Sequence, residues 1–78
     1  MQPPRVMRLI DVPSGSRARI VDVSGGLGLR GRLLQMGLVP GTPIEVIDTN
    51  RGPVIVRVRG VSMAIGRGIA RRILVELL

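Results

Sequence analysis

Residues 32–47 read RLLQMGLVPGTPIEVI, and this stretch combines the end of a helix, a glycine exit and the start of a β-strand. Leu33 and Met36 are three positions apart, so both fall on one helical face, where we expect them to pack in the core. Gly37 suits the position just past a helix end, because glycine adopts the left-handed conformation required there without strain. The stretch therefore predicts a helix that ends at about residue 36.

The chain leaves this helix through a turn. Pro40 has no backbone N–H with which to continue a helix, and Gly41 favours a turn. Residues 44–46 then alternate between apolar and charged side chains, which is typical of a strand. We assign structural roles in core packing, helix termination and turn formation to five residues of this region: Leu33, Met36, Gly37, Pro40 and Gly41.

The rest of the chain is predicted to be mainly β-structure around one short inserted helix. The helix covers about residues 28–36, and its core face consists of Leu29, Leu33 and Met36. Gly60 predicts a tight hairpin turn. Strands are predicted by the apolar or alternating segments at residues 18–23, 44–46, 54–59, 61–65 and 73–77, and a single helical turn is predicted at residues 66–72. About five short strands with close turns indicate a small closed or half-closed β-barrel.

The composition sets the size and the chemistry. The 78 residues fit a single domain, 1–78, with residues 1–7 as a loose N-terminus. The sequence contains no histidine, cysteine or aromatic residue, which excludes zinc, copper and iron–sulfur sites built within one chain. Five carboxylates remain, at Asp11, Asp22, Glu45, Asp48 and Glu76, without the spacing of a cation site. We therefore expect no metal and no cofactor.

The sequence predicts a cytoplasmic protein without enzymatic activity. No apolar run approaches the ~20 residues that span a bilayer, and no signal peptide is visible. The serines and threonines lie in predicted turns or beside small residues, and no histidine or lysine is present to activate one of them.

A glycine-rich motif precedes the helix. Residues 26–31 read GLGLRG, which matches the G-x-G-x-x-G pattern of dinucleotide-binding folds. The unit around it does not fit, because the helix is too short to cross back over a parallel sheet and no further βα units follow. We interpret these glycines as a turn into the helix.

The net charge of +7 comes with arginine as the only basic residue type. A basic small domain favours a polyanionic partner, so a nucleic-acid-binding β-barrel is the alternative function. Its candidate residues are Arg57, Arg59, Arg67, Arg71 and Arg72. The absence of aromatic side chains argues against it, because barrels that bind single strands stack bases on aromatic rings. Arginines that simply coat the solvent face of the strands are the other interpretation.

Two stretches of the chain carry a family resemblance: Arg32–Gly41, with its Met36-Gly37-Leu38 and Pro40-Gly41 elements, and Gly60–Val75, with Met63-Ala64-Ile65. Together they resemble the FeoA family, ferrous-iron transport protein A, over about Leu9 to Glu76. The resemblance implies an SH3-like β-barrel with an inserted helix. It also implies a small accessory or regulatory protein that contacts FeoB, the membrane transporter that carries Fe²⁺ inward and bears a cytosolic G-protein domain.

The candidate partner-binding residues are Leu27, Arg30 and Arg32, which the fold does not obviously need. Leu27 lies in the glycine-rich approach to the helix, and the two arginines flank its core face. An exposed leucine beside arginine is a plausible anchor at a protein–protein contact. Self-assembly is a further hypothesis, through outward apolar residues at Ile47, Ile55 and Leu74.

Overall fold

A computed structural model describes residues 5–78 of the chain. The described part of the chain contains six strands: β1 (Val6–Arg8), β2 (Arg17–Val23), β3 (Pro43–Asp48), β4 (Val54–Val58), β5 (Val61–Ile65) and β6 (Ile73–Leu77). The helices are a 3₁₀ helix, η1 (Leu9–Asp11), and two α-helices, α1 (Leu27–Gln35) and α2 (Arg67–Ala70). Within these residues, neither α-helix has the length and apolar content that crossing a bilayer requires.

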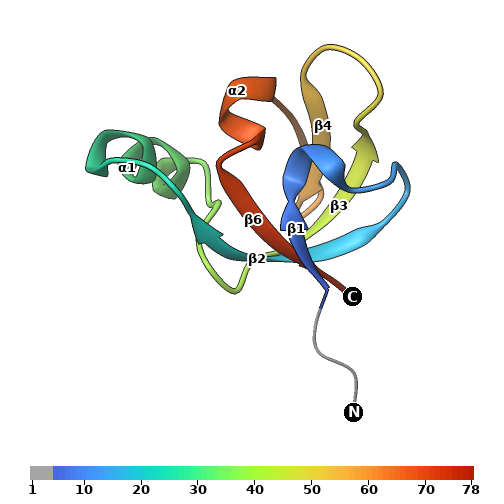
Figure 1. Cartoon of the computed structure of the whole chain (residues 1–78), viewed down its shortest axis with the longest axis horizontal. Coiled ribbons are helices and arrows are strands. Elements are labelled where there is room, and N and C mark those ends of the chain that lie inside the picture. The colour runs from blue at the N-terminus through green and yellow to red at the C-terminus, as the bar shows by residue number, and fades with distance from the viewer. Residues whose placement is uncertain (1–4) are drawn as a thin grey trace.

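The six strands form one antiparallel sheet in the order β1-β6-β2-β3-β4-β5. The sheet curls into a half-open barrel, from which α1 projects to one side (Figure 1). The helical turns η1 and α2 contact each other. The mainly β prediction, with one inserted helix, is confirmed.

The core follows the two-residue period of the strands. In β4, Val54, Val56 and Val58 are buried, whereas Ile55 and Arg57 face outward, as the alternation predicts. Sixteen buried apolar residues form a single cluster: Leu9, Val12, Ala18, Ile20, Val23, Leu33, Leu38, Ile44, Val46, Val54, Val56, Val58, Ile65, Ala70, Ile73 and Val75. Aliphatic side chains alone therefore fill the barrel.

Strand β1 at the N-terminal end of the sheet was not predicted from the sequence, which indicated about five strands. Val6 and Met7 pair with Glu76 and Val75 of β6, so the prediction of a loose N-terminus over residues 1–7 is wrong for these two residues. Residues 1–4 lie outside the described residues. A strand of three residues is too short to show a recognisable alternation, and only its pairing with β6 defines it.

The β4–β5 hairpin turns within two residues. Arg59 and Gly60 both have positive φ, 52° and 81°, which defines a type I′ turn. The tight turn predicted at Gly60 is confirmed, but Arg59 belongs to the turn rather than to the strand.

The core face predicted for α1 is correct at two of its three positions. Leu33 is buried and Leu29 packs against the core, but Met36 is 40% exposed. The physical reason is the helix end: the chain reverses at Gly37, and Leu38 then occupies the core beside Leu33. The predicted roles of Gly37 and Gly41 are confirmed, because both have positive φ.

Candidate partner-binding face

Helix α1 projects from the sheet and contacts the core through only two of its side chains, Leu29 and Leu33. It begins after Gly26, whose carbonyl accepts the first helical hydrogen bond from Arg30 N–H at 3.2 Å. No side chain caps this end. Leu29 and Leu33 attach the helix to the barrel, and the rest of its surface faces solvent (Figure 1).

Two leucines on α1 are strongly exposed. Leu27 is 88% exposed and Leu34 is 63% exposed. They are seven positions apart, so they lie on the same side of the helix, with Arg30 between them. Leucines this exposed contribute nothing to the core, and two on one helix side form an apolar strip of the kind that protein partners cover.

Beside this strip lies a groove of about 210 Å³, which we call the α1 groove. Its lining is largely apolar and consists of Asp22, Val23, Arg30, Leu34, Leu38, Val39 and Pro40. Arg30 Nη2 lies 3.9 Å from Asp22 Oδ1, and both side chains are more than half exposed, so this ion pair adds little stability. The groove thus combines a largely apolar lining with one exposed arginine and the exposed aspartate that pairs weakly with it.

The structure brings together two of the three predicted partner-binding residues. Arg30 lines the α1 groove, and Leu27 lies on the same helix side. Arg32 is exposed but sits two positions from Leu34, which places it on nearly the opposite side of the helix. Leu34 is not among the residues predicted from the sequence, although its seven-residue spacing from Leu27 places both on one helix side.

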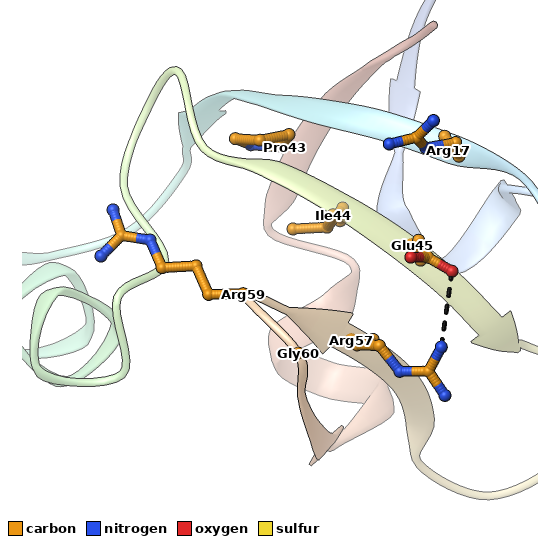
Figure 2. A pocket seen from close by; sticks show the side chains of 7 residues that line it. All are labelled: Arg17, Pro43, Ile44, Glu45, Arg57, Arg59 and Gly60. Atoms are coloured by element: carbon orange, nitrogen blue, oxygen red, sulfur yellow. Dashed lines mark ion pairs between the residues drawn. The ribbon is translucent and has the colours of Figure 1, made fainter.

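A second groove, which we call the arginine groove, has a volume of about 220 Å³. Figure 2 shows the side chains that line it. Its lining is Arg17, Pro43, Ile44, Glu45, Arg57, Arg59 and Gly60. Glu45 on β3 is directly opposite Arg17 on β2 and Arg57 on β4. Arg57 Nη1 lies 3.7 Å from Glu45 Oε2, whereas Arg59 extends from the hairpin turn away from this pair (Figure 2).

The arginines predicted as a nucleic-acid surface do not form one patch. Arg57 and Arg59 line the arginine groove. Arg67 instead donates hydrogen bonds from Nη1 to the carbonyl oxygens of Thr49 at 3.1 Å and Gly52 at 3.4 Å, so it has a structural role in the β3–β4 loop. Arg71 and Arg72 follow α2, and Arg72 lies near Gly25 at the start of α1.

The apolar residues proposed for self-assembly are mostly covered. Ile47 is exposed, but Ile55 and Leu74 are only partly accessible. Self-assembly through these side chains stays a prediction. As for metal ligands, residues 5–78 contain no group of three or more histidine, cysteine or acidic side chains arranged to hold an ion.

Comparison with known proteins shows the family to which the chain belongs. The family model of the FeoA domain matches residues 7–77. The chain belongs to the FeoA family. A Methanocaldococcus jannaschii relative with the name "Putative Fe(2+) transport protein A" is 39% identical over 62 residues. The match covers 80% of this chain and 76% of the relative.

Solved FeoA structures confirm the SH3-like fold that the resemblance implied. A crystal structure of the iron uptake regulatory protein FeoA superimposes with a TM-score of 0.89 at 39% identity, and covers 95% of this chain and 100% of its own. One FeoA relative is joined to a transporter: the Porphyromonas gingivalis "Fe(2+) transport protein A/Fe(2+) transporter FeoB fusion protein" is 38% identical over 74 residues. The match covers 92% of this chain and 9% of the fusion protein.

Proposed function

We propose that this FeoA-family chain is a cytoplasmic accessory protein of ferrous-iron uptake that binds the cytosolic side of a FeoB-type transporter. The observation that carries the proposal is the fusion relative, in which a FeoA segment similar to this chain and a FeoB transporter share one polypeptide. Fusion keeps two domains at a high effective concentration. A separate FeoA chain needs a contact surface to reach the same proximity.

The α1 strip and groove are the surface best suited to this contact. Leu27 and Leu34 present apolar side chains to solvent, and the groove beside them has a largely apolar lining. Binding energy at protein interfaces concentrates in a few such anchors, surrounded by residues that exclude water. Arg30 at the rim adds a charged donor that an acidic or carbonyl group on the transporter would accept.

The proposed mechanism is regulation by binding, without catalysis and without carriage of iron. A bound protein shifts the conformation or nucleotide state of its partner only if it binds one state more tightly than another. The chain is therefore expected to distinguish between states of the G-protein domain. This expectation separates a regulator from a mere scaffold.

The direct test is binding of the purified chain to the purified cytosolic region of a FeoB-type transporter. Isothermal titration calorimetry would be run with that region nucleotide-free, with GDP and with a non-hydrolysable GTP analogue. We expect a dissociation constant of about 10 μM or lower in at least one state, typical of a transient complex. Absence of binding at micromolar concentrations in all three states would refute the proposal.

Variants locate the contact. The double substitution Leu27→Ala with Arg30→Ala, and separately Leu34→Ala, should each weaken binding about tenfold, the effect of removing an interface anchor worth ~1.4 kcal/mol. Val6→Ala is the matched control, because Val6 is 50% exposed but lies on β1, which lines neither groove. All variants should keep nearly the parent melting temperature. A large loss of stability would show that the α1 residues belong to the core instead.

A further inference from the structure

Resting on the proposed function, we infer that the arginine groove receives an acidic segment of the same transporter. That segment would carry carboxylates beside an apolar side chain that enters the α1 groove. The inference thus names the chemical groups of the partner that each of the two grooves would bind.

The charge of the arginine groove is not balanced within the protein. The groove contains three arginines, Arg17, Arg57 and Arg59, but only one acid, Glu45. Among residues 5–78, Arg57 pairs with Glu45, and neither Arg17 nor Arg59 forms an ion pair. Two guanidinium groups are therefore free for an external anion, and arginine binds carboxylates with two parallel hydrogen bonds.

The backbone conformation at Arg59 is unusual for an arginine. Arg59 has a φ of 52° and is the only non-glycine residue with positive φ among the described residues. It occupies the first central position of a type I′ turn, where asparagine, aspartate and glycine fit with least strain. Arginine suits this position less well than those residues do, and its side chain lines the groove while extending away from the Glu45–Arg57 pair (Figure 2). Strained residues of this kind cluster at binding sites.

A short segment of chain links the linings of the two grooves. Pro40 lines one groove and Pro43 lines the other, so their Cα atoms are at most about 11 Å apart along an extended chain. The connecting residues are tied to β2, because Gly41 N–H donates to Ile20 O at 2.7 Å and Ile20 N–H donates to Thr42 O at 2.9 Å. One extended partner segment of about four residues spans this distance.

The groove favours a protein carboxylate over a nucleic acid. The chain has no aromatic side chain on which a base could stack, and single-strand binding depends on such stacking. Exposed Pro43 lies beside the arginines, and this combination suits a peptide that alternates charged and apolar groups. The short chain segment between the two linings, from Pro40 to Pro43, also argues for one protein partner rather than a dispersed polyanion.

The test compares Arg59→Asn and Arg17→Gln with Arg51→Asn in binding to the purified cytosolic region of a FeoB-type transporter. Arg51 is an exposed arginine in the loop at the other end of β4, so its removal changes net charge equally. At about 0.05 M NaCl, where charges are weakly screened, the two groove variants should each lose about tenfold in affinity. The Arg51→Asn variant should stay within about twofold of the parent. At about 0.5 M NaCl the differences should shrink, because salt screens exposed charges.

The outcomes separate this inference from the proposed function. If Leu34→Ala weakens binding but the groove variants match Arg51→Asn, the transporter contact stands and the acidic segment is refuted. If the parent chain does not bind the transporter region at all, the proposed function fails. Vesicles of phosphatidylglycerol and phosphatidylcholine and a 20-nucleotide single-stranded DNA are parallel probes. Arg59-dependent binding to either of these, without such dependence on the transporter region, would also overturn the inference.

Discussion

The backbone N–H of Leu38 donates to the carbonyl oxygen of Leu33 at 2.8 Å, across the reversal at Gly37. A second bond runs from Gly37 N–H to the carbonyl of Leu34 at 3.0 Å. These two bonds define a Schellman motif, and burial of both Leu33 and Leu38 supplies the apolar contact that accompanies it. The motif fixes where α1 ends, and hence where Leu34 meets the loop that forms the rest of the α1 groove.

Gly37→Ala should destabilise the protein by about 1 kcal/mol. Gly37 has a φ of 80°, and no atom lies within 4 Å of where a Cβ would be placed. The loss therefore reflects backbone conformation and not a clash. Urea unfolding followed by far-ultraviolet circular dichroism measures it.

Gly31→Ala is the matched control for this effect. Gly31 lies inside α1 without positive φ, and a Cβ there also meets open space. Because alanine favours the helix over glycine, this variant should gain roughly 0.5–1 kcal/mol. Equal losses at positions 31 and 37 would contradict the assignment of the Schellman motif.

Truncation of two adjacent leucines in α1 should change the free energy of unfolding by very different amounts. Leu33 is 1% exposed in the core cluster, so Leu33→Ala should cost about 2–4 kcal/mol by leaving a cavity. Leu34 is largely exposed, so Leu34→Ala should change stability by less than ~0.5 kcal/mol. Chemical denaturation of both variants tests the pair. A costly Leu34→Ala would remove the argument that Leu34 is available to a partner.

The parts of this fold that were predictable from sequence are those controlled by local chemistry. The helix stop at Gly37 and the hairpin turn at Gly60 follow from conformations that glycine favours, and the burial of Val54, Val56 and Val58 follows from strand periodicity. The burial of Met36 was wrongly predicted, because helical spacing does not reveal that Leu38, beyond the helix end, occupies the core instead. Strand β1 was missed because only its partner β6 defines it.

The candidate site shows the same division. Leu27 and Arg30 were identified from their position in the glycine-rich approach to α1. The arginine groove was only half identified, because Arg17 joins Arg57 through the registers of β2 with β3 and of β3 with β4. Strand register between segments forty positions apart is a tertiary property. Arg67 was grouped with the surface arginines, although its guanidinium holds a loop.

Arg67→Ala should loosen the β3–β4 loop. Its Nη1 donates to the carbonyls of both Thr49 and Gly52, and this shared, partly exposed pair of hydrogen bonds contributes ~1 kcal/mol in total. Amide hydrogen exchange of residues 49–52 should therefore accelerate by about fivefold. Arg71→Ala is the control, since Arg71 is exposed and forms no side-chain bond among residues 5–78. Unchanged exchange in the Arg67→Ala variant would refute this structural role.

Arg59→Asn should make the protein more stable, by about 0.5–1 kcal/mol, because asparagine tolerates the left-handed conformation better than arginine. Arg59 has a φ of 52° and no ion pair within the described residues, so little folded-state interaction is lost with its side chain. Thermal unfolding measures the gain. Arg57→Asn provides the contrast: Arg57 lies in β4 and pairs with Glu45, so its replacement should be neutral or destabilising. A lower melting temperature for the Arg59→Asn variant would show that Arg59 serves the fold itself, and the strain at this turn would then no longer point to a binding role.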